Sequence, residues 1–372
     1  MIHVAGSKGK GSTCLFAEAA LESAGRRTGV FTSPHLHRWT ERFRVAGREV
    51  DGACLAGAVT RLRPQVEWLR ENDPENAPTF FDATTAAAML IFAEAELDYV
   101  VLEVGLGGRL DSTNVVTPRV TCITSIELEH TDKLGNTIEE IAAEKAGIIK
   151  PGVPCLIGRL PVEAERVAVE RAGSLGAPLY RLGHDFPAVS STELSVLGEH
   201  QADNAGIALA ALSHLGELET PDFIEQARAG VRGASLPGRM EVLGEDPWVI
   251  VDGAHTRDSA QALARVLSSR ETARATLLLS ISSDKNLDAI FASLLPRFDR
   301  VVLTCADPYR SLSVDDLALR VRAVEPNLEL EKISDPGEAA RAARATTGSG
   351  ELLVAAGSVY LAAAAREQWR GN

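Results

Sequence analysis

A glycine-rich segment with two lysines stands close to the start of the sequence. Residues 6–12 read GSKGKGS and follow the short, mostly apolar run of residues 2–5. The three glycines let backbone N–H groups converge on one point, and Lys10 adds a mobile cation. If a helix begins directly after the segment, its N-terminus adds partial positive charge. This glycine-rich loop therefore predicts a site for the phosphates of a nucleoside triphosphate.

The pattern around the glycine-rich loop is that of a strand, a turn and a helix. Residues 13–24 have a helical pattern that Gly25 ends. The spacing GxxGKGS differs from GxxxxGK[ST], the more common pattern of phosphate-binding loops. A tight strand-to-helix turn with an exposed lysine is the structural alternative to nucleotide binding.

Two further side chains follow predicted strands and could hold a metal ion. Glu103 ends an apolar run and precedes a glycine-rich turn, where a carboxylate can hold Mg²⁺ beside bound phosphates. An ion pair with Arg109 is the structural alternative for Glu103. His130 also follows a strand-like run, and by itself it fits a structural role as well as a functional one.

Strand and helix patterns alternate along most of the chain, which favours an α/β fold with a parallel sheet. A first series of strands is expected at residues 28–32, 99–104, 120–126 and 154–157. A second series is expected at residues 248–251, 276–279, 301–304, 328–333 and 352–355, with helices at 259–267, 314–324 and 337–343. The second series predicts a smaller α/β domain. Small residues and a proline at 233–239 mark the expected joint.

The composition argues against several classes of protein. The chain has 372 residues, of which 45% are hydrophobic and 24% charged, and this length suits two domains. A net charge of −13 argues against nonspecific binding to nucleic acid. No apolar run is long enough to predict a membrane span, no export signal is recognisable, and the five cysteines have no CxxC spacing. We therefore expect a cytoplasmic protein without nucleic-acid or membrane partners.

Eight motifs in a fixed order resemble those of folylpolyglutamate synthase and the related dihydrofolate synthase. They are residues 3–13 (HVAGSKGKGST), 32–36 (TSPHL), 103–114 (EVGLGGRLDSTN), 130–135 (HTDKLG), 144–148 (EKAGI), 200–204 (HQADN), 237–239 (PGR) and 252–255 (DGAH). Weaker similarity continues at residues 283–285 and 357–358. The resemblance implies a Mur-ligase-like α/β protein with a phosphate-loop ATPase domain on a parallel sheet at 1–236. A smaller, Rossmann-like glutamate-ligase domain is implied at 237–372.

The resemblance also implies an ATP-dependent ligase reaction. ATP would phosphorylate a carboxylate of a folate, and the amine of L-glutamate would attack the acyl phosphate to give an amide, ADP and phosphate. The implied phosphate-binding residues are Gly9, Lys10, Gly11 and Ser12. Ser12 could also cap the helix or reach the metal, and we favour capping together with phosphate contact. The implied Mg²⁺ ligands are Ser33, Glu103 and His130.

The resemblance implies a chemical modification of a lysine in the fifth motif. Lys145 matches a family lysine that is carbamylated by CO₂, which turns the cation into an anion that can support the metal site. An ion pair with Glu103 or with Glu144 is the alternative role of Lys145.

The remaining residues implied by the resemblance are expected to contact the nucleotide or the substrates. Asn204, Arg239 and Asp252 match family positions for the nucleotide base and ribose. Asn204 could also cap a helix over residues 204–215, and Arg239 could instead contact phosphate or form an interdomain salt bridge. His255 is expected near the transferred phosphate or the incoming glutamate. The substrate-side candidates are Asp82, which replaces a family glutamate, Arg42, Asp111 and Ser358.

The chain departs from the family at its start, because relatives usually carry some tens of residues before the first strand. We therefore expect either further residues upstream of Met1 or an altered pterin pocket, and we favour folylpolyglutamate synthesis. The alternatives are a bifunctional dihydrofolate synthase acting on dihydropteroate, a Mur-type amino-acid ligase and a non-catalytic nucleotide-responsive binding protein. A monomer is expected.

Overall fold

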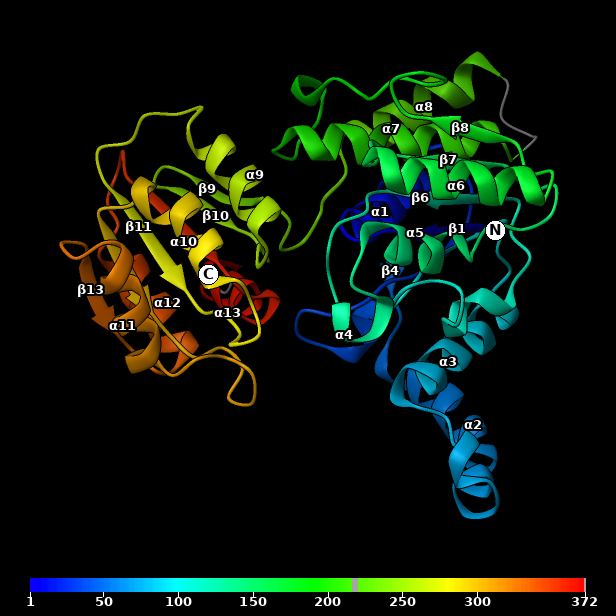
Figure 1. The fold of residues 1–372 in the computed structure, drawn as a ribbon, viewed down its shortest axis with the longest axis horizontal. Coiled ribbons are helices and arrows are strands. Elements are labelled where there is room, and N and C mark those ends of the chain that lie inside the picture. Colours follow the sequence, from blue (N-terminus) through cyan, green and yellow to red (C-terminus); the bar gives the residue numbers. More distant parts are fainter. Residues whose placement is uncertain (216–219, 371–372) are drawn as a thin grey trace. The chain divides into compact units, whose positions relative to one another are not determined.

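The computed structural model describes residues 1–215 and 220–370 and divides into two compact units (Figure 1). The first unit comprises Met1–Ser195 and His200–Ala234, and the second comprises Val196–Glu199 and Ser235–Asn372. Our proposed bounds of 1–236 and 237–372 place the short segment Val196–Glu199 in the first domain, whereas it belongs to the second unit, where its Leu197 packs against the core.

The first unit is built on an eight-stranded sheet with the order β4-β3-β2-β5-β1-β6-β7-β8. Strand β1 is central and pairs in parallel with β5 and β6, so that Val4 lies beside both Glu103 and Cys122. The glycine-rich loop therefore leaves the middle of the sheet, directly beside the end of β5. The strands are β1 (Ile2–Ala5), β2 (Thr28–Phe31), β3 (Phe43–Val45), β4 (Arg48–Glu49), β5 (Tyr99–Glu103), β6 (Val120–Ile123), β7 (Cys155–Ile157) and β8 (Leu179–Arg181).

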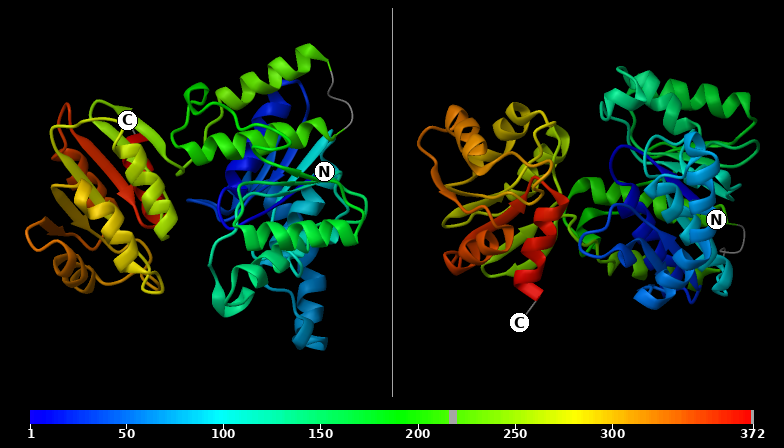
Figure 2. Two further views of the ribbon diagram at one scale, coloured as in Figure 1. Left: turned by 45° about the horizontal axis from the view of Figure 1, so that its top comes forward. Right: turned by 90° about the horizontal axis from the view of Figure 1, so that it is seen from below.

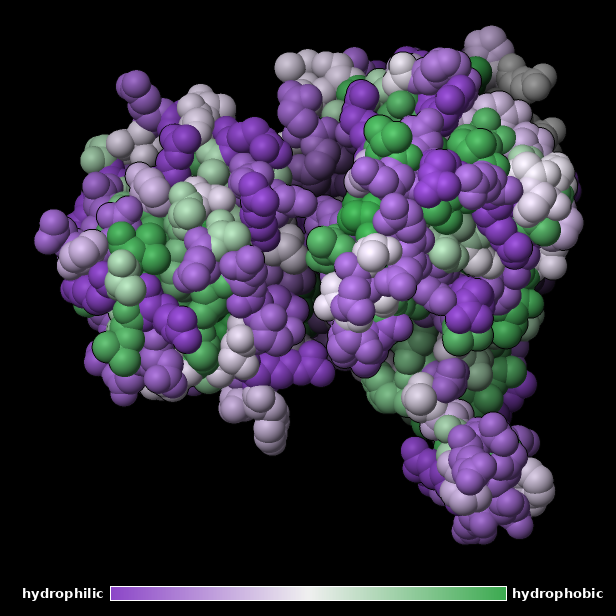
Figure 3. All heavy atoms as spheres, viewed as in Figure 1, coloured by the Kyte–Doolittle hydropathy of each residue, from purple (hydrophilic) through white to green (hydrophobic). Residues whose placement is uncertain are grey.

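The helices of the first unit begin where the sequence supplies caps. Thr79 and Asp82 form a capping box at the start of α3, and Thr137 and Glu140 form one at the start of α5. The α-helices are α1 (Lys10–Ser23), α2 (Gly52–Asn72), α3 (Phe80–Glu94), α4 (Thr131–Leu134), α5 (Ile138–Ala146), α6 (Val162–Ser174), α7 (Glu199–Ser213) and α8 (Pro221–Arg232). The 3₁₀ helices are η1 (Trp39–Arg42), η2 (Pro74–Asn76), η3 (Ser112–Val115) and η4 (Ser191–Glu193). Helix α2 extends away from the sheet, and its far end is mostly hydrophilic on the face shown in Figure 3, as a solvated helix requires.

The second unit has a six-stranded sheet with the order β13-β12-β11-β14-β10-β9, in which only β9 is antiparallel to its neighbour among the described strands (Figure 2). Its strands are β9 (Glu241–Glu245), β10 (Trp248–Val251), β11 (Ala275–Leu279), β12 (Arg300–Leu303), β13 (Glu329–Lys332) and β14 (Leu352–Ala356). Its helices are α9 (Arg257–Leu267), α10 (Leu287–Leu294), η5 (Leu295–Arg297), α11 (Val314–Val324), α12 (Pro336–Ala345) and α13 (Val359–Arg370).

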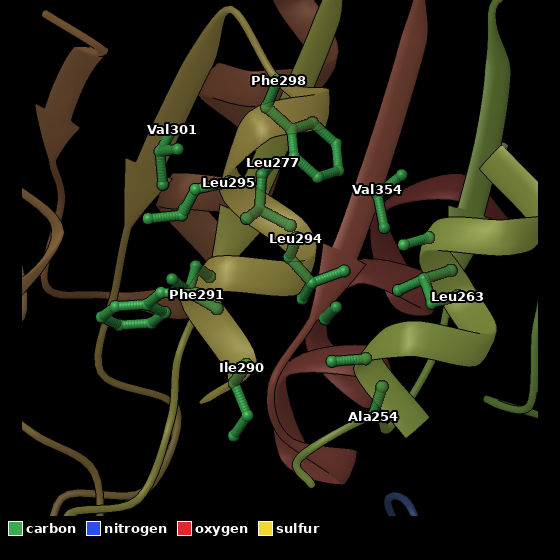
Figure 4. Close-up of a cluster of buried hydrophobic side chains, with 14 of the residues drawn as sticks. Ala254, Leu263, Leu277, Ile290, Phe291, Leu294, Leu295, Phe298, Val301 and Val354 are labelled. Carbon is green, nitrogen blue, oxygen red and sulfur yellow. The ribbon is translucent and has the colours of Figure 1, made fainter. Parts of the chain in front are cut away.

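Both faces of this second sheet are covered by helices. Along β10, Trp248 and Ile250 point into the cluster formed with α9, α10 and α11, which Figure 4 shows in part. Val249 and Val251 point into the opposite cluster, formed with α12 and α13. A strand buried on both faces needs a continuous apolar run, which explains why this strand was visible in the sequence.

The predicted α/β class with two sheets is confirmed, and the differences are local. The strand at 248–251 and the helix at 314–324 have the predicted bounds. The strand expected at 120–126 ends at Ile123, because Thr124 turns to bond the glycine-rich loop. Strands β3, β4, β8 and β9 were not predicted, since strands of two to five residues carry little pattern. No described helix has both the length and the apolarity that a membrane crossing needs.

A buried ion pair ties β9 to α13 in the second unit. The Nε of Arg366 donates to Oε2 of Glu241 at 2.5 Å, and the two side chains are 9% and 8% exposed. We expect Arg366→Met to lower the free energy of unfolding by about 3 kcal/mol, because a buried carboxylate loses its counter-charge. Urea unfolding followed by circular dichroism measures this change. The double variant Arg366→Met/Glu241→Gln should regain most of the loss, and a single variant as stable as the parent would contradict the expectation.

A buried histidine in β1 makes the stability of the first unit depend on pH. Burial, aided by the charge of Lys150, lowers the pKa of His3 to about 3, and its Nε2 lies 2.8 Å from Oγ1 of Thr113. Below pH 6.5 the unfolded chain binds a proton that the folded chain does not, so stability falls as the pH falls. We expect His3 to account for a loss of about 2 kcal/mol between pH 7 and pH 5. Unfolding curves of His3→Gln should lack this part of the pH dependence, and an unchanged pH dependence would exclude the assignment.

Candidate active site

The glycine-rich loop is held in place by the end of β6. Gly6 and Gly9 have φ values of +148° and +84°, which favour glycine. A Cβ on Gly6 would lie 2.0 Å from Oγ1 of Thr124, so no larger residue fits there. Ser125 accepts the N–H of Ser7 through its carbonyl at 2.8 Å and that of Lys8 through its hydroxyl at 2.9 Å. These contacts fix the loop before any ligand arrives.

Lys10 and Ser12 occupy the first turn of α1. The Nζ of Lys10 donates to the carbonyl of Gly6 at 2.8 Å and so folds back over the glycine-rich loop. Helix α1 begins at Lys10 with Gly9 as its N-cap, without a side-chain cap, so the expectation that Ser12 caps the helix is wrong. The N–H groups of residues 10–12 precede the first intrahelical bond, from Thr13 to Gly9, and can therefore face an anion.

Glu103 lies directly against this turn. Its side chain is buried, and its Oε2 accepts the N–H of Ser33 at 2.8 Å and lies 3.3 Å from the position of a Cβ on Gly11. The alternative ion pair between Glu103 and Arg109 is wrong, because Arg109 pairs with Glu144 at 2.8 Å. The sheet thus brings Glu103 and Ser33 to the start of α1.

The expected metal ligands consist of one carboxylate, one hydroxyl and one imidazole. His130 has φ +48° and starts α4, in the connection that follows β6. Among the described residues, no three His, Cys, Asp or Glu side chains are grouped to hold a metal ion. The expected set contains only two such side chains, Glu103 and His130. A buried carboxylate beside Ser33 and the amides of α1 fits a hard divalent cation, and the full ligand set stays a prediction.

Lys145 has a partner that the sequence did not indicate. Its side chain is 2% exposed, and Nζ donates to Oε1 of Glu129 at 3.0 Å, so the alternatives Glu103 and Glu144 are both wrong. Burial, together with the charge of Lys10, lowers the pKa of Lys145 to about 8, although Glu129 opposes the shift. Oε2 of Glu129 also lies 3.6 Å from Nζ of Lys8.

Glu129 is the residue of this site that sequence reasoning missed. Burial by itself would raise the pKa of Glu129, but the positive charges of Lys145, Lys10 and Lys8 together outweigh burial, so the pKa is lowered. Its position directly before the HTDKLG motif was the only available signal. Glu129 therefore carries the negative charge that lets two lysines stand close to the glycine-rich loop.

Asn204 packs on the glycine-rich loop from α7. Helix α7 begins at Glu199, so Asn204 is an interior residue and the expectation that it caps a helix is wrong. Its Nδ2 donates to Oε1 of Gln201 at 3.0 Å, and its Oδ1 lies 2.2 Å from where a Cβ on Gly9 would be. Asn204 thus lies against Gly9 of the loop, and its contact with a nucleotide stays a prediction.

Two of the substrate-side aspartates organise the segment after β5. Asp111 accepts the N–H groups of Gly105 and Leu106 at 3.0 and 2.9 Å through one oxygen, and that of Thr113 through the other. Asp82 bonds Thr79 and accepts the hydroxyl of Ser112. These bonds give both aspartates a positioning role, and substrate contact stays a prediction.

Arg42 belongs to an aromatic group on the same unit. Its Nε donates to Nδ1 of His35 at 2.9 Å, and its guanidinium lies 5.6 Å from the centre of the Phe80 ring. The ring of Trp39 is 5.2 Å from that of Phe80. A flat ring system and a carboxylate could both bind here, since aromatic faces stack and guanidinium pairs with carboxylate.

The second unit gathers four predicted residues at the carboxyl ends of β10 and β14. The carboxylate of Asp252 accepts the N–H groups of Met240 and Ala254 at 2.7 Å each, and burial raises its pKa while Arg239 opposes that. Nη1 of Arg239 lies 2.8 Å from where a Cβ on Gly253 would be. Two further contacts complete the group. Nδ1 of His255 lies 2.6 Å from the carbonyl oxygen of Gly253, and the N–H of Tyr360 donates to Oγ of Ser358 at 3.2 Å.

Comparison with known proteins identifies the family. The chain matches the Mur ligase middle domain over residues 4–157 and the Mur ligase glutamate ligase domain over residues 238–359. It is 34% identical to the dihydrofolate synthase/folylpolyglutamate synthase of Bacillus subtilis, over 96% of this chain and 87% of that protein. The chain belongs to the folylpolyglutamate synthase/dihydrofolate synthase family. It is accordingly an enzyme of the ligase class, and a non-catalytic role is set aside.

Other members of the folylpolyglutamate synthase/dihydrofolate synthase family extend the comparison. The chain is 36% identical, over 99% of its length, to a probable bifunctional folylpolyglutamate synthase/dihydropteroate synthase of Halobacterium salinarum, of which it covers 47%. The Mycobacterium tuberculosis folylpolyglutamate synthase complexed with ADP and AMPPCP has a TM-score of 0.90 at 32% identity, with coverage of 99% of this chain and 90% of that one. A bifunctional relative with Mn, AMPPNP and L-glutamate bound has a TM-score of 0.86 at 33% identity, with coverage of 99% and 89%.

Proposed function

We propose that this chain is an ATP-dependent ligase that adds L-glutamate to a folate through an acyl phosphate, giving ADP and phosphate. The observation that carries the proposal is the glycine-rich loop, fixed by Thr124, Ser125 and Asn204, with Lys10 folded over it and Glu103 against its helix. Relatives with bound nucleotide and bound L-glutamate support it.

The activation step follows from the chemistry of the carboxylate, which is a poor electrophile until it is phosphorylated. The amides of residues 10–12 and the ammonium of Lys10 are positioned to neutralise the phosphates of ATP. Ser33, Glu103 and His130 would hold Mg²⁺, which would supply charge neutralisation at the transferred phosphate. His255 and Ser358 would orient the incoming glutamate, whose amine displaces phosphate from the acyl group.

The direct test incubates purified protein with Mg²⁺, ATP, L-glutamate and a tetrahydrofolate. We expect folate-dependent ADP release and a mass gain of one glutamyl residue per cycle. A second arm with dihydropteroate decides whether the chain also acts as a dihydrofolate synthase, as the name of the Bacillus subtilis relative implies for that protein. A third arm with a uridine-nucleotide precursor tests the Mur-type alternative. Folded protein that glutamylates neither pterin substrate would overturn the proposal.

We further propose that Lys145 is carbamylated. A pKa of about 8 leaves part of the amine neutral near pH 7.5, and a neutral amine can attack CO₂, form an N–C bond and release one proton. Glu129, which faces Lys145, is then left with Lys10 and Lys8 as its nearby positive charges.

Replacement of Lys145 tests the carbamate. Lys145→Ala should lower turnover by about 10²-fold, as expected when a group that supports transition-state charge is lost. Added short carboxylates should restore part of the activity, because they replace the anion, whereas chloride at equal ionic strength should not. Mass spectrometry after trapping of the carbamate gives an independent readout. If no carboxylate restores the activity and no added mass is found on Lys145, carbamylation is contradicted and Lys145 has only a structural role.

The chain is further proposed to act as a cytoplasmic monomer without nucleic-acid or membrane partners. Size-exclusion chromatography with light scattering measures the mass in solution, and a stable dimer would correct the proposal.

A further inference from the structure

The first unit contains a cavity that the proposed reaction does not use. It lies between α7, α8 and the segment of residues 186–193, and its volume is about 490 Å³. Cavities of this size commonly bind small organic molecules. Within the described part of the chain, none of the residues expected to contact nucleotide, metal or substrate lines this α7–α8 cavity.

Most of the wall is apolar and is built into the fold. Its apolar side chains include Phe186, Val189, Leu209, Leu212, Phe223 and Val231. Gly206 of α7 allows the 186–193 segment to approach, because a Cβ there would lie 2.7 Å from the carbonyl oxygen of Pro187. At this point α7 and the 186–193 segment are therefore in direct contact.

The charged residues of the wall are two arginines and one glutamate. Arg232 is paired with Glu225 at 2.7 Å, so its charge is already balanced. Among the residues that the structure describes, Arg228 is paired neither with Glu193, which also lines the cavity, nor with any other acid. The wall therefore combines apolar side chains with the guanidinium of Arg228 and the carboxylate of Glu193, and this guanidinium is complementary to the carboxylate of a molecule with a hydrocarbon body.

We propose that the α7–α8 cavity binds a small amphipathic carboxylate. Its hydrocarbon part lies against Leu209, Leu212 and Phe223, and its carboxylate accepts hydrogen bonds from Arg228.

Both helices of the cavity also support the glycine-rich loop. Asn204 of α7 lies against Gly9, and Gly230 of α8 lies against α1, where a Cβ would be 2.1 Å from the carbonyl oxygen of Ala19. A ligand that fixes α7 against α8 therefore acts on one contact of the loop and on one contact of the helix that follows it, and we expect it to change nucleotide affinity. By linkage, nucleotide must change the affinity of that ligand by the same factor. This second consequence rests on the proposed ATP site.

The test uses decanoate as the probe and the full chain without nucleotide. Isothermal titration compares the parent with Arg228→Gln, with Ala210→Trp, which fills the cavity, and with Arg320→Gln, an exposed arginine of α11 that serves as control. We expect decanoate to bind the parent and Arg320→Gln alike, Arg228→Gln roughly 10-fold more weakly, and Ala210→Trp not at all. Decanol, which lacks the charge, should not distinguish Arg228→Gln from the parent. Basal ligase activity of Arg228→Gln should be unchanged.

Equal decanoate binding by all four proteins would overturn the proposal, as would no binding to the parent. A dimer that Ala210→Trp abolishes would assign the cavity to a second copy of the chain and would also overturn it. Arg228→Gln changes an exposed side chain, so it keeps the test decisive if Ala210→Trp does not fold. Repetition with ADP present measures the coupling separately, because the first titrations contain no nucleotide.

Discussion

Replacing Lys10 by alanine should lower kcat/KM by about two to three orders of magnitude while the fold is retained. The reason is electrostatic, because Lys10 is the cation that the glycine-rich loop holds over its own carbonyls, where the transferred phosphate would gain charge. Loss of one positioned charge partner costs about 3 to 4 kcal/mol in the transition state. Folate-dependent ADP release measures the effect.

The matched control for Lys10 is Lys332→Ala, because Lys332 is half-exposed in β13 and pairs with the exposed Asp315 at 2.7 Å. This control should keep full turnover. The far-ultraviolet circular dichroism and unfolding midpoint of Lys10→Ala should match the parent. Turnover of Lys10→Ala within threefold of the parent would remove Lys10 from the reaction and leave the loop as a structural turn.

Replacing Glu103 by glutamine should have an effect of similar size, about two orders of magnitude in kcat. Glutamine has nearly the same shape and can still accept the N–H of Ser33, so the change removes charge and little else. If Glu103 is a metal ligand, the Mg²⁺ concentration for half-maximal activity should rise together with the loss of turnover. Activity titrated against Mg²⁺ and against Mn²⁺ gives both quantities.

Glu94→Gln is the matched control for Glu103, because Glu94 of α3 forms an exposed ion pair with Arg61 of α2. Exposed pairs contribute about 0–1 kcal/mol to stability, and this one is not expected to contact substrate. A Glu103→Gln enzyme with an unchanged Mg²⁺ requirement would show that the carboxylate positions Ser33 and holds no metal ion.

Much of the fold was predictable because its signals are local. Buried parallel strands such as Trp248–Val251 show as continuous apolar runs, and α5 begins at the capping threonine Thr137. The start of α1 was placed three residues late, because its N-cap is a glycine in a left-handed conformation with no side-chain signal. Helix α7 begins five residues before Asn204, since nothing in the HQADN motif marks a helix start.

The partners of charged residues were not predictable, because they depend on which elements the sheet brings together. Glu103 and Arg109 are close in sequence, yet Arg109 pairs with Glu144 of α5. Lys145 is adjacent to Glu144 but points inward, to Glu129, which follows β6. Both errors assumed that sequence proximity sets ion pairs, whereas helix geometry sends neighbouring residues to different sides.

The sequence by itself determined the family, the two α/β series and the glycine-rich loop, because glycine spacing and buried apolar runs act over a few residues. Only the tertiary structure decided that Glu129 joins Lys8 and Lys145, that Asn204 and Thr124 contact the loop, and that α7 and α8 enclose a cavity. Several of these contacts join residues more than a hundred positions apart in the chain, as Lys8 and Glu129 are. Their contacts exist only once the sheet has fixed the strand order.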